Sequence, residues 1–249
     1  MESNDFTFVL DGENIHFEPG QTIMEAASHA GVYIPHLCYH PEFKPRGSCK
    51  LCTVKINGYF GTACTLPVQP GMQVESDCDE VNLMRRRVVQ MLFIEGNHYC
   101  PFCEKSGNCQ LQAVAYHVGM LDSHFPHFYP LRQIDASHPD MLLDRDRCIQ
   151  CELCVRASRE TDQKNIFGLA GRSTHTHLVV NSESGLLGDT DFSINDFAAH
   201  ICPTGALIPK TQAFNIPIGR RIYDEQDIAK VGHLQPDESL QSNQQGEAK

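Results

Sequence analysis

Cysteine placement constrains this chain of 249 residues more than any other feature of its sequence. Eleven of the twelve cysteines fall into three groups spaced like metal ligands, and Cys78 stands apart. The groups are Cys38, Cys49, Cys52 and Cys64; Cys100, Cys103 and Cys109, with His98 just before them; and Cys148, Cys151, Cys154 and Cys202. Each group offers four possible ligands, and thiolate-rich sites of this kind select iron–sulfur clusters or zinc.

The cysteines could instead form disulfides, but the start of the chain argues against that pairing. MESNDFTFVL has no basic segment followed by an apolar stretch, so we expect no signal peptide and a cytoplasmic protein with reduced thiols. The longest near-apolar stretch, 88–94, is interrupted by Gln90, so we expect no membrane span.

A net charge of −11 disfavours a nucleic-acid partner. The only tight basic run, 85–87, is interpreted as a solvated helix face.

The N-terminal segment predicts a small sheet with one helix packed across it. Strands are expected at 6–10 and 14–18, because a turn sequence separates them. A helix then begins at Thr22, where Glu25 completes a capping box, and it ends before Gly31. This order of elements is typical of a ferredoxin-like β-grasp domain.

A second hairpin explains how the first ligand group can assemble. Asn57-Gly58 is a strong hairpin signal, and folding about it places Cys64 one residue from the position opposite Cys52. The spacing is not that of two zinc knuckles, so the group favours a 2Fe–2S cluster over a zinc ribbon.

The second group should lie in a loop between two helices. One helix is expected to start at Ser76 or Asp79 and to end at Gly96, and another covers 110–118. His98 is the expected fourth ligand, for a 4Fe–4S cluster. Two alternatives remain: Cys78, which a helix of about four turns separates from the group, and His117, which should sit on the following helix.

The third group is the most specific. CxxCxxC followed by a distant Cys-Pro is the ferredoxin signature of a 4Fe–4S cluster, and Cys202 would close it. Zinc sites favour paired knuckles rather than a triple. We also expect a strand at 178–181 and a short helix from Ser193 or Asn195 to His200.

The sequence carries no motif for catalysis or nucleotide binding. It has neither GxGxxG after a strand nor GxxxxGK[ST], and no plausible triad or carboxylate pair, so we expect no substrate-binding active site in this chain. Clusters without a substrate site indicate electron transport. The predicted fold is α+β, with a β-grasp 2Fe–2S ferredoxin domain (1–78), a small helical His/Cys3 domain (79–131), a C-terminal 4Fe–4S ferredoxin-like domain (132–231) and a polar, disordered tail (232–249).

Five stretches carry a resemblance to a known family: GVYIPHLCY, EGNHYCPFCEKSGNCQLQAVAY, DRCIQCELCVR, ICPTGAL and IPIGRRIYD. Over residues 6–223 the chain resembles the small iron–sulfur subunit of the diaphorase half of Hox-type, NAD-reducing nickel–iron hydrogenases. Similar modules open the large iron–sulfur subunit of complex I and the N-terminal region of some iron-only hydrogenases.

The resemblance implies one 2Fe–2S and two 4Fe–4S clusters. It implies a flavin- and NAD-binding diaphorase subunit and the small and large nickel–iron hydrogenase subunits as partners, which hold FMN, NAD and the NiFe centre. Electrons would pass reversibly between hydrogen and NAD through this subunit of an oxidoreductase. Gly47 and Gly107 are expected to let backbone N–H groups approach cluster sulfur.

The sequence is also compatible with three other functions. The same module could serve an NAD-dependent formate dehydrogenase or a complex I-like enzyme. A zinc-stapled interaction module would bind zinc without sulfide. A cluster-based redox sensor would need an effector or DNA-binding region, and the acidic charge disfavours DNA.

Overall fold

The computed structural model describes residues 6–211 and 214–232, so nearly all of the predicted polar tail lies outside the described residues. The described chain divides into two compact units. One takes in residues up to 90 together with 114–122, and the other takes in 91–113 and the residues from 123 onward. None of the helices in the described segments has both the length and the apolar character needed to span a bilayer.

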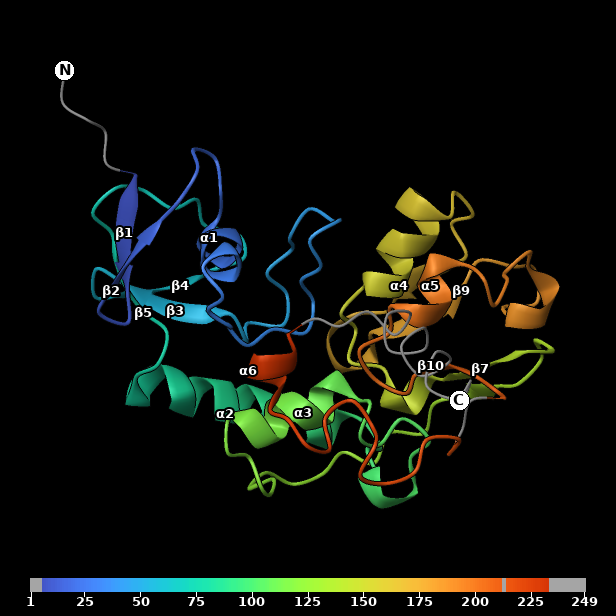
Figure 1. Ribbon diagram of the computed structural model, residues 1–249. Coiled ribbons are helices and arrows are strands. Elements are labelled where there is room, and N and C mark those ends of the chain that lie inside the picture. Colours follow the sequence, from blue (N-terminus) through green and yellow to red (C-terminus); the bar gives the residue numbers. More distant parts are fainter. Residues whose placement is uncertain (1–5, 212–213, 233–249) are drawn as a thin grey trace, which may run out of the picture. The chain divides into compact units, whose positions relative to one another are not determined.

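The first unit is built on a five-stranded sheet with helix α1 (Ile23–His29) lying across it (Figure 1). The strand order is β2-β1-β5-β3-β4. β1 and β5 run parallel, and the other neighbours are antiparallel. The strands are β1 (Thr7–Leu10), β2 (Glu13–His16), β3 (Thr53–Ile56), β4 (Tyr59–Thr62) and β5 (Gln73–Glu75).

Local signals account for much of this unit. The Thr22 hydroxyl accepts a hydrogen bond from the Glu25 N–H, while the Glu25 carboxylate accepts one from the Thr22 N–H, as the capping box predicts. The hairpin at Asn57-Gly58 pairs Ile56 with Tyr59 and Val54 with Gly61, in the expected register. Apolar residues from β1, β2 and α1 form the core between sheet and helix.

Two longer helices follow, α2 (Asp79–Glu95) and α3 (Gln110–His117). α2 starts at the later of the two expected positions, and α3 ends one residue before the expected Val118. The interpretation of 85–87 as a solvated face is wrong for Arg85, which is only 3% exposed, although Arg86 and Arg87 are exposed.

The second unit carries two small sheets and several short helices. β10, β7 and β6 form an antiparallel sheet in that order, and β8 pairs with β9. The strands are β6 (Ile134–Asp135), β7 (Met141–Asp144), β8 (Phe167–Ala170), β9 (His177–Val180) and β10 (Leu207–Pro209), and the α-helices are α4 (Leu153–Arg156), α5 (Phe197–His200) and α6 (Ile228–Val231). Single 3-10 turns include η1 (Cys100–Phe102) and η2 (Arg145–Arg147).

Two boundaries in this unit differ from those expected. The strand predicted at 178–181 lies one residue earlier, as β9. The helix predicted from Ser193 or Asn195 starts only at Phe197, because its first N–H groups are capped from a distant loop. The Asp162 carboxylate accepts hydrogen bonds from the backbone of Phe197 and Ala198.

Candidate metal centres

The first ligand group lies in the first unit, and the hairpin of β3 and β4 brings two of its members together. Cys52 directly precedes β3 and Cys64 follows β4, and their sulfur atoms lie 3.2 Å apart. The Cys49 N–H points at the Cys38 sulfur, 3.4 Å away. The Gly47 N–H bonds the Cys64 sulfur and helps to lower the pKa of that thiol, as expected for a glycine in a cluster loop.

The four thiols of this group are arranged as two hydrogen-bonded pairs. The Cys49 thiol donates to Cys38 and lowers the pKa of Cys38 to about 5, while the pKa of Cys49 itself is raised. The Cys52 thiol lowers the pKa of Cys64 in the same way, and its own pKa is raised. The pairing thus favours the thiolate form, which binds metal, in Cys38 and Cys64 over their partners.

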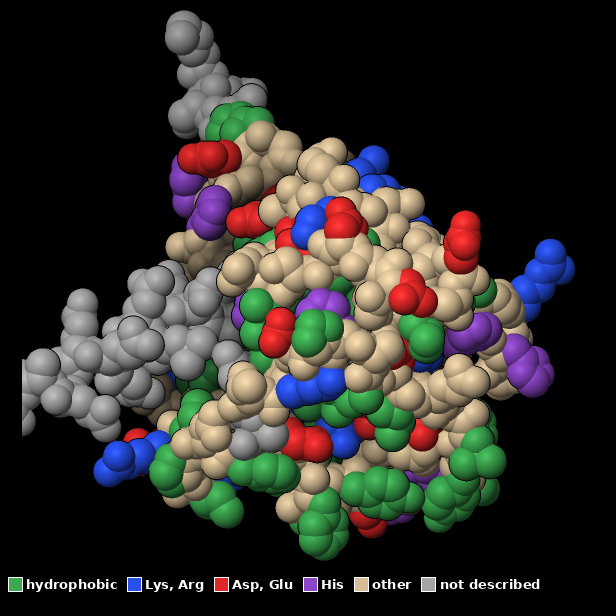
Figure 2. Space-filling model, turned by 90° about the vertical axis from the view of Figure 1, so that its right-hand side faces the viewer, with side chains coloured by type: hydrophobic (Ala, Val, Ile, Leu, Met, Phe, Trp, Pro, Cys, Tyr) green, Lys and Arg blue, Asp and Glu red, His purple; other side chains and the backbone are tan. Residues whose placement is uncertain are grey.

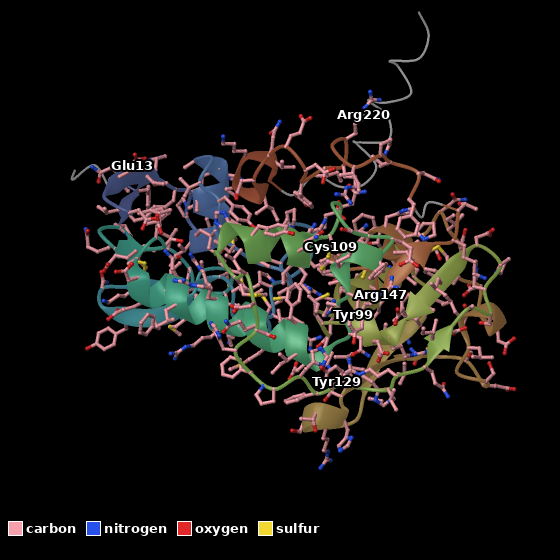
Figure 3. All side chains as sticks on the ribbon, turned by 90° about the horizontal axis from the view of Figure 1, so that it is seen from below. Glu13, Tyr99, Cys109, Tyr129, Arg147 and Arg220 are labelled. Atoms are coloured by element: carbon pink, nitrogen blue, oxygen red, sulfur yellow. The ribbon has the colours of Figure 1, made fainter. Side chains whose placement is uncertain are left out.

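The second group lines one pocket in the second unit. His98, Cys100, Cys103 and Cys109 all border it, together with Phe93 and Arg147. Figure 3 shows Tyr99, Cys109 and Arg147 close together around this pocket. His117, the competing histidine, packs edge-on against Tyr33 in the other unit instead.

His98 has the chemistry of a ligand. Its Nε2 atom is buried and has no hydrogen-bond partner among the described residues. Burial, followed by the charge of Arg147, lowers the pKa of His98 to about 4, so the ring is neutral at pH 7. A buried, unpartnered nitrogen in a pocket lined by three cysteines fits a metal site, because a buried polar atom otherwise costs free energy. Gly96 permits this arrangement, since a Cβ atom there would lie 2.6 Å from His98 Nε2 and from the Asp146 carbonyl oxygen.

The loop of the second group is held from more than a hundred residues away. The Arg221 guanidinium donates to the Ser106 carbonyl, the Tyr223 N–H to the Gly107 carbonyl, and the Ile222 N–H to the Asn108 side chain. Arg221 is itself fixed by the carboxylate of Asp224. The IPIGRRIYD stretch therefore clamps the second ligand loop.

The expectation for Gly107 is wrong in its detail. Its N–H donates to the side-chain oxygen of Gln112 rather than to sulfur. Glycine is required there for two other reasons. Its φ of +77° is in the left-handed region, and a Cβ atom would collide with the guanidinium of Arg221.

The third group surrounds the start of α4. The Gln150 N–H points at the Cys148 sulfur, 3.4 Å away. Burial raises the pKa of Cys154, and the neighbouring Cys151, Cys202 and Cys148 thiolates raise it further, so the four sulfurs act on one another electrostatically. Gln150 and Glu152, on either side of Cys151, both adopt positive φ, 56° and 60°.

The second and third groups adjoin each other within the second unit. Pro203, which follows Cys202, accepts a hydrogen bond from the Gln110 N–H, and its carbonyl oxygen lies 3.7 Å from the Cys109 sulfur. Arg147 borders the second pocket and directly precedes Cys148. Pro203 therefore touches the Cys109 sulfur of the second group and is covalently joined to Cys202 of the third group.

All twelve cysteines are free thiols. Among the residues described, no three His, Cys, Asp or Glu side chains converge on one point that could hold a single metal ion. A cluster does not need such convergence, because its ligands bind different irons.

Sequence reasoning missed the arginines around these groups. Arg85 lies beside the first group, Arg147 beside the second and Arg145 beside the third. The sequence offers one hint of them. Arg85 is a charged residue among the apolar positions of the helix expected to end at Gly96, and a buried charge needs partners. Cys78 stays outside all three groups; its carbonyl accepts the first hydrogen bond of α2.

Comparison with known families confirms the three-module fold. Residues 3–78 match the 2Fe-2S iron-sulfur cluster binding domain. Residues 85–124 match the NADH-ubiquinone oxidoreductase-G iron-sulfur binding region. Residues 139–208 match the ferredoxin-like domain of NADH-quinone oxidoreductase subunit 3. The chain is therefore α+β and carries 2Fe–2S and 4Fe–4S binding modules.

Individual relatives indicate more specifically which family the chain belongs to. The chain is 40% identical over 220 residues to the NAD-reducing hydrogenase HoxS subunit gamma of Cupriavidus necator, covering 88% of this chain and 93% of that one. It is 30% identical to the NADPH-Fe(3+) oxidoreductase subunit alpha of Geobacter sulfurreducens, but spans only 24% of that protein.

A solved structure agrees with the first of these relatives. A chain in the crystal structure of an NAD+-reducing [NiFe]-hydrogenase in the H2-reduced state is 53% identical, with a TM-score of 0.87 and coverage of 90% of this chain and 95% of that chain. Similarity at this level over nearly the whole of both relatives shows kinship rather than a shared fold alone. The chain belongs to the family of iron–sulfur subunits of NAD-reducing nickel–iron hydrogenases.

Proposed function

We propose that this chain relays electrons, through one 2Fe–2S and two 4Fe–4S clusters, between a nickel–iron hydrogenase module and a flavin- and NAD-binding diaphorase module. The overall reaction of the complex is reversible transfer of electrons from hydrogen to NAD. The observation that carries the proposal is the grouping of twelve candidate ligands into three separate sets. When bound, the clusters supply one-electron carriers.

Each set has its own ligands in this proposal. Cys38, Cys49, Cys52 and Cys64 hold the 2Fe–2S cluster; His98, Cys100, Cys103 and Cys109 hold one 4Fe–4S cluster; and Cys148, Cys151, Cys154 and Cys202 hold the other. The buried nitrogen of His98 and the paired thiols of the first group support this assignment. The Pro203 carbonyl beside Cys109 supports direct exchange between the two 4Fe–4S clusters.

The partners are the diaphorase subunit and the small and large hydrogenase subunits, in the cytoplasm. Exposed aromatic residues support a partner contact at the second loop, where Phe102 is 83% and Tyr99 is 58% exposed, both next to proposed ligands. Exposed hydrophobic side chains are also visible among charged ones on the face drawn in Figure 2. We also propose that the three cluster-binding domains meet near residues 78 and 131, so that each domain contains one ligand set.

The test is anaerobic purification of the chain with its co-expressed partners. We expect about ten irons and about ten acid-labile sulfides for each copy of the chain, and NAD reduction driven by hydrogen. Zinc without sulfide would overturn the cluster assignment. Reduction driven by formate but not by hydrogen would place the subunit in a formate dehydrogenase instead.

A further inference from the structure

Arg85 is a buried cation with an unusual set of partners. Its guanidinium donates from Nε to the Leu51 carbonyl at 3.0 Å and from NH2 to the Thr53 carbonyl at 3.0 Å. It also donates to the Ser76 carbonyl at 2.7 Å and to the Ser76 hydroxyl at 2.9 Å. The two carbonyls at 51 and 53 belong to the residues on either side of Cys52.

All four acceptors are uncharged, which leaves the charge of Arg85 without a bonded counter-ion in the described residues. Burying an uncompensated charge is costly, so a buried guanidinium needs negative charge nearby. Burial lowers the pKa of Arg85, and the electrostatic contributions that oppose this are led by Cys52, ahead of Asp11. A 2Fe–2S cluster held by four thiolates would supply such a charge at this place.

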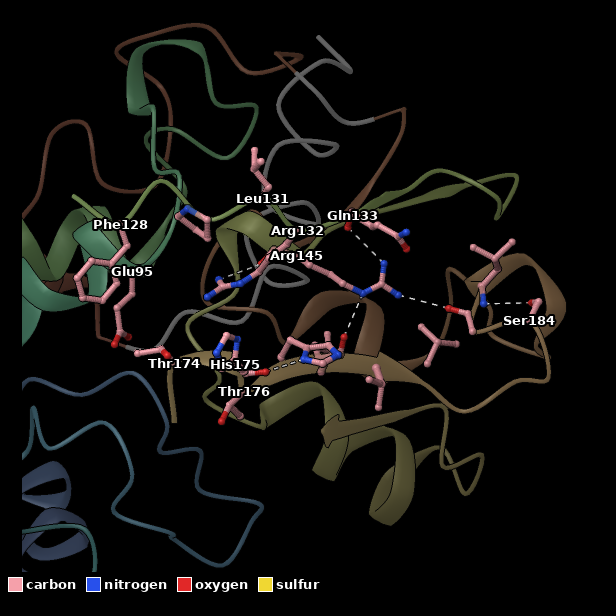
Figure 4. A pocket seen from close by; sticks show the side chains of 17 residues that line it. Glu95, Phe128, Leu131, Arg132, Gln133, Arg145, Thr174, His175, Thr176 and Ser184 are labelled. Atoms are coloured by element: carbon pink, nitrogen blue, oxygen red, sulfur yellow. Dashed lines mark hydrogen bonds between the residues drawn. The ribbon is translucent and has the colours of Figure 1, made fainter. Parts of the chain in front are cut away.

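The arginines at the other two groups are compensated differently. Arg147 forms ion pairs with Glu104 at 2.5 Å and with Asp144 at 2.8 Å. Arg145 donates to the carbonyls of Leu178, Gln133 and Gly185, which are not adjacent to ligands, and its charge helps to lower the pKa of Asp135 (Figure 4). Arg85 differs from both because its bonds go to the ligand loop itself.

We propose that Arg85 is a positioning residue for the first cluster: it fixes the loop around Cys52, and its charge makes that cluster easier to reduce. This inference rests on the proposed function, since it requires a 2Fe–2S cluster at the first group. One-electron reduction adds one negative charge to the cluster, and a nearby fixed cation stabilises the more negative state. Because Arg85 is buried, salt screens this effect little.

The test is a redox titration of the co-purified complex, followed by the electron paramagnetic resonance signal of the 2Fe–2S cluster. Arg85→Gln should shift the midpoint potential to more negative values, by about 59 mV if the equilibrium for reduction changes about tenfold. Arg85→Lys keeps the charge and should titrate closer to the wild type. Arg86→Gln, an exposed neighbour on the same helix, should leave the potential unchanged.

The outcomes separate this inference from the proposed function. A wild-type complex without any 2Fe–2S signal would refute the function. A normal wild-type signal with the same midpoint in Arg85→Gln would overturn the role of Arg85. If Arg85→Gln does not retain its cluster, Ser76→Asp keeps the guanidinium and brings a carboxylate to it. That variant should also shift the midpoint to more negative values, and an unchanged midpoint would again overturn the inference.

Discussion

The first and second ligand groups reach the same number of ligands by different means. In the first group, regular structure places two of the four sulfurs: Cys52 and Cys64 flank paired strands of one hairpin. In the second group, the ligands lie on an irregular loop that a segment around Arg221 holds in place. The meeting of Cys52 and Cys64 is therefore encoded locally, whereas the second site depends on contacts between residues far apart in the chain.

This difference shows which changes each site should tolerate. Because strand pairing persists without the ligands, the hairpin part of the first site should be damaged mainly by loss of a ligand. A site built on a clamped loop should also be damaged from outside, by changes that never touch a ligand. The following predictions test that contrast.

The largest expected effect is loss of a whole cluster from the hairpin site. Cys64→Ala should lower the iron content from about ten to about eight per chain and abolish only the 2Fe–2S signal. Cys78→Ala is the matched control in the same unit, and its iron content should equal that of the wild type. A drop in iron for Cys78→Ala would mean that the ligand set has been assigned incorrectly.

His98→Ala removes the proposed nitrogen ligand from the clamped site. Only one of the two 4Fe–4S signals should change, and iron release to a chelator from that cluster should accelerate by about 100-fold or more. His117→Ala serves as the control, because its ring contacts Tyr33 rather than the pocket. Identical spectra for His98→Ala and the wild type would point to another fourth ligand.

Gly107→Ala tests the clamp without altering a ligand. The new methyl group must displace Arg221, so the second cluster should be released about 10–100-fold faster while the first is unaffected. Gly119→Ala is the control: φ there is +67°, but a Cβ atom has no neighbour within 4 Å. Backbone strain of about 1–2 kcal/mol is then the only expected cost. Equal effects of the two variants would exclude the clamp.

The smallest effect is expected at the ion pair that anchors the clamp. Asp224→Asn removes the charge that holds Arg221, whose ion pair has side chains only 19% and 12% exposed. We expect the free energy of unfolding of this region to fall by about 1–2 kcal/mol. The second cluster signal should then disappear at a lower urea concentration. Glu160→Gln breaks an exposed pair with Arg159 and should change the free energy of unfolding by no more than about 0.5 kcal/mol.

The same contrast explains how much the sequence could predict. The capping box at Thr22, the hairpin register and the extent of α2 depend on residues near in sequence, so local rules found them. The start of α5 was misplaced because its cap comes from Asp162. The bonds of Arg85 and the contact of Arg221 with the second loop also join distant segments, and no local pattern encodes them.

The spacing of the candidate ligands can be predicted better than the burial and charge around them, again because of the difference between local and distant contacts. A spacing such as CxxC is a property of the chain alone, while burial and charge depend on the whole fold. The missing thiolate of the second group predicts His98 as a ligand, and its buried Nε2 atom in the structure adds a second reason. Gly107 was correctly singled out, but for the wrong contact.

The ligand loops also carry a cost that bears on how the protein matures. Lys50 lies between Cys49 and Cys52 with φ of +59°, and Gln150 and Glu152 occupy the same region in the third group. Side chains other than glycine cost about 1–2 kcal/mol each in this conformation. In the proposed assignment, bonds to iron offset that cost, so we expect the newly made chain to reach its full stability only on cluster insertion. The cellular abundance of this subunit should therefore follow the supply of clusters as closely as its own rate of synthesis.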